Sequence, residues 1–382
     1  MVSVSIKARA PLYIAAAAVL SFGVCLFTQG ASAHSGAYDG LIICGQIIIP
    51  SLFPFMVLSS FITRSGLSSM LGKIFSPFAR LFYLPKDAGL PLFLSFIAGY
   101  PVGASTASRL HEDGTLSSDE ALRMTCFAVC GGPAFIVKAV GQGMLGSVRA
   151  GILLLSAHIS AAVLLGIFSG IYSRLSDRRR RKTDKGSAPA QPPAEQSHVD
   201  IHTSAVSAKR KSVADAFVES VRDGCTGMFS ICGCVIIFSC ILSIISSFNL
   251  PETASTALGC LLEVTTGCFN AASSGNLVFI AAVLGFGGLS VCCQIFSAAG
   301  GLRINYVKFF SFRLMHAALS AVIMLVLQSI FPAAAAVSGS MDAGITALPS
   351  QASVPASAAL VFMSIIFLCS TSKGRLVLGR KV

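Results

Sequence analysis

Charged side chains are scarce in this sequence. Only 12% of its 382 residues are Asp, Glu, Lys or Arg, whereas a typical soluble domain has about 25%. Hydrophobic residues make up 54% of the chain, and its mean hydropathy is +0.78. So small a polar surface excludes a soluble globular body of this size.

The sequence also lacks the motifs of common enzymes and pumps. It contains no GxxxxGK[ST], no HExxH and no GxSxG sequence. ATP-driven transport and common hydrolase chemistry therefore have no support, and we expect neither an enzyme nor a cofactor. The 13 cysteines do not have the spacing of zinc ligands, so we interpret them as small apolar helix residues without a metal.

Continuous apolar segments of about 20 residues recur along the chain, the length that an α-helix needs to cross a bilayer. They do not alternate apolar and polar residues with a period of two, so they predict helices rather than barrel strands. Ser117 and Glu120 have the spacing of a capping box, which predicts the start of one helix. The sequence thus predicts an all-α polytopic membrane protein with about eight transmembrane helices.

Lys and Arg are concentrated in two segments. Ten of them lie between Arg174 and Lys211, and four lie in the tail after residue 372. Basic runs also occur in proteins that bind nucleic acid, but in a membrane protein they mark cytoplasmic segments. We therefore place 173–212 and the tail in the cytoplasm, and 332–355, which has no Lys or Arg, outside. No nucleic-acid partner is expected.

The N-terminal segment 1–38 has two interpretations. Lys7 and Arg9 precede an apolar run over 11–27, and Ala31-Ser32-Ala33 after it resembles the cleavage site of a signal peptide. The same run also suits an uncleaved first span with its N-terminus inside. We favour the uncleaved span, because many more spans follow.

Two apolar segments are expected to enter the membrane and return on the same side. Segments 64–86 and 173–212 are both placed inside, so the chain must cross the membrane an even number of times between them. Three apolar segments lie there, so one of them must enter and leave on the same side. The re-entrant candidate is 88–110, which the sequence Gly-Tyr-Pro-Val-Gly interrupts, because Gly and Pro break helices. The same reasoning in the second half selects 254–269. Segment 64–86 itself is expected to lie at the membrane interface as an amphipathic segment.

The two halves of the chain repeat one order of elements. In each half the re-entrant segment precedes a span with a glycine-rich break, at 131–133 and at 285–288. Charge places the halves in opposite orientations, and inverted repeats with interrupted helices are typical of secondary transporters. The expected parts are an N-terminal span or signal-like segment, a first Gate-type repeat, a disordered basic linker, a second repeat, and an outer loop with a last span and a cytoplasmic tail. Their bounds are 1–38, 39–172, 173–212, 213–331 and 332–382.

Polar residues beside the breaks form the candidate solute site. Glu263 lies in an apolar segment, and a buried carboxylate there is a functional hypothesis by default. It could bind the solute, a coupling proton or a cation, or could only hold the backbone of its own hairpin. Lys138 could balance an anion or extend to the interface. The candidate residues are Glu263, Thr265, Thr266, Gly267, Tyr100, Gly99, Gly103, Gly131, Gly132, Lys138, Gly288 and Gln294.

Two histidines, His158 and His316, follow the broken spans at comparable distances. We interpret them as residues that hydrogen-bond between helices, with a functional role as the alternative. The glycines and prolines at the breaks likewise have an alternative role in helix packing.

Short sequences at the breaks carry a family resemblance. They are PSLFPF at 50–55, GYPVG at 99–103, GGPAFI at 131–136, EVTTG at 263–267 and GGLSV at 287–291. In this order they resemble the sporulation integral membrane protein family (YlbJ type), which carries the nucleoside-recognition Gate domain. The resemblance, over 39–331, implies a part in moving dipicolinate from mother cell to forespore, in the membrane around the developing spore. Gate domains also occur in nucleoside and iron transport systems, so the solute stays open.

Three functions compete at this point. The leading one is a multi-pass cell-membrane transporter of a small anionic solute such as dipicolinate, with a nucleoside or another polar solute as the alternative. The second is a non-transporting membrane scaffold for spore assembly. The third is an intramembrane enzyme that uses Glu263 with His158 or His316 as acid and base. The expected surrounding is the lipid bilayer, and the sequence leaves open a coupling ion and a homo-oligomer.

The contrast in Lys and Arg content yields a test of topology. A cysteine introduced at Ser187, in the basic linker, should be protected from an impermeant thiol reagent added outside intact cells, whereas one at Ser350 should react. The measurement is labelling in a background without other cysteines. Reaction at Ser187 but not at Ser350 would refute both the topology and the inversion of the halves.

Overall fold

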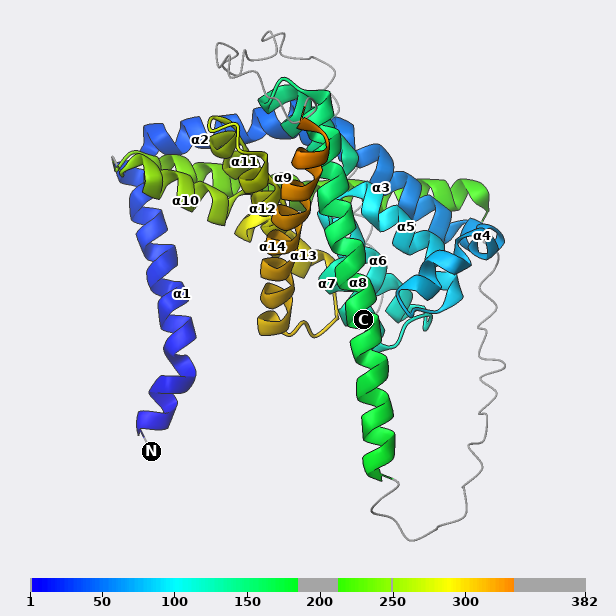
Figure 1. Ribbon diagram of the computed structural model, residues 1–382. Coiled ribbons are helices and arrows are strands. Elements are labelled where there is room, and N and C mark those ends of the chain that lie inside the picture. The colour runs from blue at the N-terminus through cyan, green and yellow to red at the C-terminus, as the bar shows by residue number, and fades with distance from the viewer. Residues whose placement is uncertain (1, 185–211, 249, 333–382) are drawn as a thin grey trace.

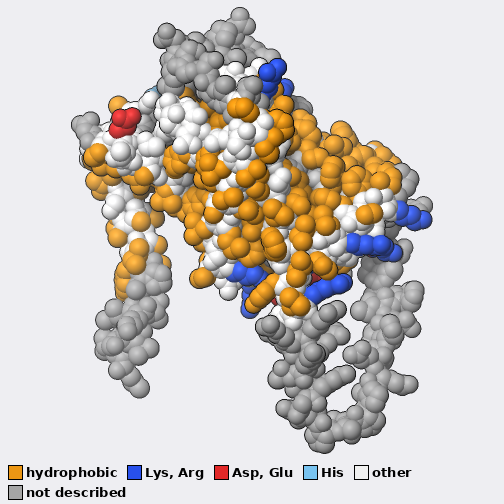
Figure 2. All heavy atoms as spheres, viewed as in Figure 1, with side chains coloured by type: hydrophobic (Ala, Val, Ile, Leu, Met, Phe, Trp, Pro, Cys, Tyr) orange, Lys and Arg blue, Asp and Glu red, His pale blue; other side chains and the backbone are white. Residues whose placement is uncertain are grey.

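The computed structural model describes residues 2–184, 212–248 and 250–332, and all regular secondary structure in these ranges is helical. Hydrophobic side chains cover most of the surface seen in Figure 2, with Lys and Arg near its margins. Large exposed apolar surfaces mark contact with a membrane or a partner. The predicted class, an α-helical polytopic membrane protein, is confirmed.

The first half contains two long helices, one hairpin and one broken helix (Figure 1). Its predicted capping box is present, because the Ser117 hydroxyl accepts from the Glu120 N–H and the Glu120 carboxylate accepts from the Ser117 N–H. The elements are α1 (Val2–Thr28), α2 (Gly30–Ile43), the π-helix η1 (Cys44–Ile48), α3 (Ile49–Arg64), α4 (Leu67–Leu81), η2 (Lys86–Ala88), α5 (Gly89–Ala98), α6 (Tyr100–Glu112), α7 (Ser118–Phe127), the π-helix η3 (Ala134–Met144) and α8 (Val148–Asp184).

The second half repeats the order of a long helix, a hairpin, a broken helix and a long helix. Its elements are α9 (Val213–Ser246), α10 (Glu252–Leu262), α11 (Val264–Ala272), α12 (Leu277–Phe286), α13 (Gly288–Ala298) and α14 (Tyr306–Ile330). The matching series in the first half is α3, the α5–α6 hairpin, the broken α7–η3 helix and α8. The opposite orientation of the two halves in the membrane stays a prediction.

Four helical segments are long and apolar enough to cross a membrane. Two pairs of helices also meet this criterion, but they are bent by 100° and 103° at a break, so the number is four, or up to six. The expected number of about eight is not confirmed, and the predicted last span lies outside the described residues. The four segments are Val148–Ser176, Val213–Ser246, Leu277–Ala298 and Tyr306–Ile330.

Two expected boundaries differ from the observed helices. The helix α2 begins at Gly30, so the proposed boundary between residues 38 and 39 falls inside it. The helix α8 continues to Asp184, into the segment predicted as a disordered linker. The chain stays helical at Pro50, because the wider turns of η1 lead directly into α3. A proline has no N–H to donate, which favours such a local change of helix type.

The amphipathic helix α4 is bent by 103° relative to the segment that follows it, η2 with α5. The buried guanidinium of Arg123, on α7, donates to the carbonyls of Phe82 (2.6 Å) and Tyr83 (2.9 Å), just beyond the end of α4. A cation at that position pairs the carbonyls that a helix C-terminus leaves free. The predicted amphipathic segment is therefore a separate helix, whose position at a membrane interface stays a prediction.

Contacts between the halves involve their hairpins and broken helices. The second arm of the first hairpin, α6, packs against α13, and the second arm of the other hairpin, α11, contacts η3. The long helices α8 and α14 also pack against each other. Glycine also permits a close approach between α2 and α9, since a Cβ at Gly36 of α2 would lie 2.5 Å from the Ser239 carbonyl oxygen of α9.

Candidate functional site

Four helix breaks lie in the apolar part of the fold. Gly99 separates α5 from α6 with φ of 103°, and Gly287 separates α12 from α13 with φ of 85°. Only glycine adopts such values without strain. Glu263, in extended conformation, separates α10 from α11, and residues 128–133 separate α7 from η3. The sequence predicted a break at each of these four places.

Each hairpin tip lies against the broken helix of its own half. A Cβ added to Gly132 would lie 2.8 Å from the carbonyl oxygen of Ile97 in the first hairpin. A Cβ added to Gly288 would lie 3.1 Å from the backbone nitrogen of Val264 in the second hairpin. Glycine is therefore required at both points, because a side chain would push the backbones of the breaks apart.

Tyr100 connects the first hairpin to the broken helix of the second half. Its hydroxyl donates to the carbonyl of Leu284 over 2.9 Å, and its side chain is 6% exposed. The same hydroxyl lies 3.0 Å from the position of a Cβ on Gly131. The breaks of the two halves thus meet in one buried region.

Arg313 of α14 binds both broken helices. Its side chain is fully buried, and its guanidinium donates to the carbonyls of Val129 (2.9 Å) and Gly285 (2.6 Å). These carbonyls lie at the C-terminal ends of α7 and α12, where free carbonyls give partial negative charge. One buried cation therefore stabilises two helix ends from different halves.

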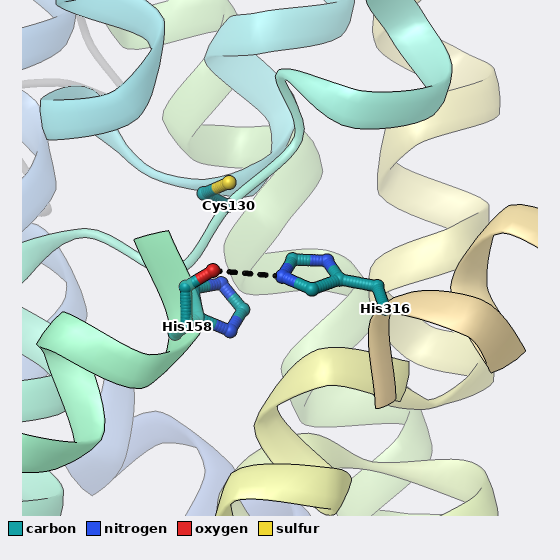
Figure 3. A group of neighbouring side chains, drawn as sticks. All are labelled: Cys130, His158 and His316. Atoms are coloured by element: carbon teal, nitrogen blue, oxygen red, sulfur yellow. Dashed lines mark hydrogen bonds between the residues drawn. The ribbon is translucent and has the colours of Figure 1, made fainter. Parts of the chain in front are cut away.

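The two histidines extend this contact to α8. His316 hydrogen-bonds the Arg313 guanidinium through Nδ1, and its Nε2 donates to the His158 carbonyl over 2.9 Å. His158 Nε2 accepts from the Gly131 N–H over 3.0 Å, and the two rings stack with centroids 4.4 Å apart (Figure 3). The interpretation of both histidines as residues that hydrogen-bond between helices agrees with these contacts.

Cys130, His158 and His316 together have the composition of a metal site (Figure 3). One potential ligand atom from each lies within 4.8 Å of the others, and all three side chains are buried. However, both His316 nitrogens are engaged, and His158 uses Nε2 as an acceptor, so in its neutral form Nδ1 carries the proton. The adjacent guanidinium also repels a cation. As arranged, this cluster connects helices and does not offer the free electron pairs that a metal needs.

Glu263 is the second buried charge of this region. Its side chain is 2% exposed, and its carboxylate accepts from the Thr266 N–H over 2.7 Å, as the N-cap of α11. A carboxylate at a helix N-terminus pairs free N–H groups and opposes the positive end of the helix dipole. The alternative considered from sequence, a carboxylate that holds its own hairpin, therefore has direct structural support, and a role in solute binding stays a prediction.

The remaining predicted site residues divide between buried and exposed positions. Gln294 and Thr265 are buried, and Gln294 donates to the Ser290 hydroxyl over 3.4 Å. Gly103 and Gly267 permit close helix contacts, with Cβ positions 2.3 Å from the Ala128 oxygen and 2.8 Å from the Cys260 Cα. Lys138 is exposed on η3, outside the buried region.

Sequence reasoning missed Arg313. The signal was available, because an arginine inside an apolar span is unusual and marks function or a specific partner. The polar residue predicted for this part of the span was His316, three residues later.

Comparisons with known proteins agree with this arrangement. Residues 46–148, which include the first hairpin and the first broken helix, match the Gate family model, described as nucleoside recognition. Over 315 residues the chain is 27% identical to the sporulation integral membrane protein YlbJ of Bacillus subtilis (strain 168), covering 75% of this chain and 76% of that protein. No solved structure matches the chain. The predicted resemblance is thus confirmed: residues 46–148 match the Gate family model, and most of the chain is similar to the sporulation integral membrane protein YlbJ.

Proposed function

We propose that this protein transports a small anionic solute across a membrane during sporulation. The observation that carries the proposal is the meeting of four helix breaks, two from each half, around the buried side chains of Arg313 and Glu263. Backbone at a break is costly in hydrocarbon unless it is paired or lines a polar site. Breaks in matching positions of two halves are typical of the binding sites of secondary transporters.

The chemistry of the region favours an anion. Among the described residues, the Arg313 Nε and the His158 Nδ1 are buried without a hydrogen-bond partner, and both are donors in the arrangement described above. Buried donors seldom stay unpaired. The helices α6 and α13 also begin at the breaks without a side-chain cap, and helix N-termini attract anions. An acceptor-rich solute would pair these groups.

Dipicolinate is the first candidate solute. The family resemblance implies it, and a planar dianion has the carboxylate oxygens that unpaired N–H donors bind. The name of the Bacillus subtilis relative supports a role in sporulation. We accordingly place the protein in the membrane around the forespore, where it would carry dipicolinate from the mother cell.

A nucleoside is the alternative solute, and one observation favours it. The family model matched by residues 46–148 is described as nucleoside recognition. A nucleoside is uncharged and would bring no anionic group to Arg313, which would keep only its helix-end carbonyls. The two solutes therefore make different demands on the same residues.

Uptake by purified protein in proteoliposomes tests the function directly. Labelled dipicolinate should accumulate faster than in protein-free vesicles, and labelled nucleosides should not. Accumulation of nucleosides alone would show that the transported solute is a nucleoside and not dipicolinate. Absence of uptake for both would favour the membrane scaffold, and chemical conversion of a solute would favour the enzyme.

Replacement of Glu263 tests its place in the solute site. Glu263→Gln keeps an oxygen that can accept from the Thr266 N–H, so membrane abundance should stay normal while solute uptake falls about tenfold or more. The matched control is Glu252→Gln at the exposed start of α10, which should change neither quantity. Normal abundance together with normal uptake in Glu263→Gln would remove this carboxylate from the site.

Replacement of Arg313 tests the contact between the broken helices. Arg313→Lys keeps the charge, but one ammonium group cannot reach the Val129 carbonyl, the Gly285 carbonyl and His316 together. An unpaired buried carbonyl costs about 1–3 kcal/mol, so the melting temperature in detergent and the rate of uptake should both fall. Arg149→Lys, on the exposed start of α8, is the control. Equal melting temperatures for the two variants would contradict the assigned role.

A further inference from the structure

A second group of charged side chains lies where α3, α6 and α9 meet. Asp223 of α9 is its centre, because its Oδ2 lies 2.7 Å from both Nε and NH2 of Arg64 at the end of α3. The Ser60 hydroxyl donates to the same oxygen over 2.7 Å. Arg109, near the end of α6, places its NH1 3.5 Å from it.

The group is balanced in charge and cross-connected. Glu219, one turn before Asp223 on α9, lies 2.8 Å from the NH1 of Arg64. Arg109 also donates to the Ser60 hydroxyl over 3.0 Å. Two guanidinium groups, two carboxylates and the Ser60 hydroxyl therefore join α6 to α3 and α9, and we call these five side chains the Asp223 network.

A neighbouring glycine makes the network possible. A Cβ on Gly224 would lie 2.8 Å from the Val57 side chain, so only glycine lets α9 approach α3 this closely without displacement of that side chain. The Asp-Gly pair at the start of the second half is thus explained by one contact. In the similar pair at the start of the first half, Gly40 packs against Ile236 of α9 while Asp39 is exposed.

The network lies at the opposite end of α6 from the candidate solute site. Tyr100 begins α6 and reaches the broken helix of the second half, whereas Arg109 is close to its other end. A helix rises about 1.5 Å per residue, so these two contacts are separated by roughly 14 Å along one rigid element. A displacement of α6 at Arg109 is therefore transmitted along the helix to Tyr100.

Partial exposure makes the contact reversible. The ion-paired side chains are 27% to 36% exposed. Ion pairs in contact with water stabilise a structure only weakly, because hydration of the separated charges offsets most of their attraction. A fully buried pair would resist separation, because each charge would be left without solvent. The exposure of this network suits contacts that break and form again during a transport cycle.

We propose that the Asp223 network is a latch that closes the first hairpin against α3 and α9 on the predicted cytoplasmic side, and that it opens when the solute site is exposed to that side. The proposal rests on the transport function proposed above. Placement on the cytoplasmic side follows from the basic segments 64–86 and 173–212, which border α3 and α9.

The test uses as reporter a cysteine at a buried position of α6, Ser108, whose hydroxyl faces Gly300 after α13, so that labelling there reports movement of the hairpin arm. Ser108 lies next to Arg109 and is 5% exposed, so Ser108→Cys should react slowly with an impermeant maleimide in inverted vesicles. Asp223→Asn removes the charge that both arginines share, and the reaction of Cys at 108 should become about fivefold faster. Mass spectrometry of the peptide with residue 108 measures the rate in the presence of the native cysteines.

The control is the same substitution at an exposed aspartate outside the Asp223 network, just before the hairpin. Asp87→Asn changes an exposed aspartate in η2, before α5, and should leave the labelling rate unchanged. Arg109→Gln is a second test variant, which removes only the hairpin's own link and should also accelerate labelling if Asp223→Asn does not reach the membrane. Equal rates in the test and control variants would overturn the latch.

The labelling experiment is independent of the solute. Faster labelling without uptake of any solute would support the latch and refute transport. Uptake by the unsubstituted protein with unchanged labelling in both test variants would refute the latch and leave transport in place.

Discussion

The contact on which this fold depends is the one between the Arg313 guanidinium and two carbonyl groups at helix ends. Val129 follows the C-terminus of α7 and Gly285 lies in the last turn of α12, and the same buried cation pairs with both. In an apolar surrounding no water is available to replace it. The breaks, the hairpin tips and the histidine pair are arranged around this contact, so the two halves share one polar centre.

The two buried charges of the centre follow one electrostatic rule. Arg313 lies at the negative C-terminal ends of α7 and α12, whereas Glu263 lies at the positive N-terminal end of α11. A helix dipole stabilises charge of the opposite sign within its terminal turn. Arg313 and Glu263 can therefore both be buried in the apolar part of the fold. The helix ends, which would otherwise be unpaired, serve as their counter-charges. A ligand anion near Arg313 would compete with carbonyl groups and not with a carboxylate bound to it.

Features that depend on residues close together in the chain were predicted from the sequence. Contacts between residues far apart in the chain were missed. The four breaks could be found because glycine, proline and Glu263 interrupt apolar runs, and the Ser117–Glu120 cap because its partners are three residues apart. The role of Arg313 was not predictable, because its acceptors are 184 and 28 residues away in the chain. The number of spans was not confirmed, since π-helices and short broken helices distribute the apolar runs over pieces too short to cross a membrane alone. Exposure of Lys138 likewise depends on the turn type of η3, which composition does not determine.

The separation of Arg313 from Val129 has a consequence for biosynthesis. The ribosome completes the first broken helix 184 residues before it adds the arginine that pairs with it. At about 5–20 residues per second, this interval lasts roughly 10–40 s. During that time the nascent first half is in the membrane with a helix end that lacks its cation, and any temporary partner, such as water or the insertion machinery, must later be displaced. The contact between the two broken helices is therefore completed late, when α14 packs against α8 and α12, which are already synthesised.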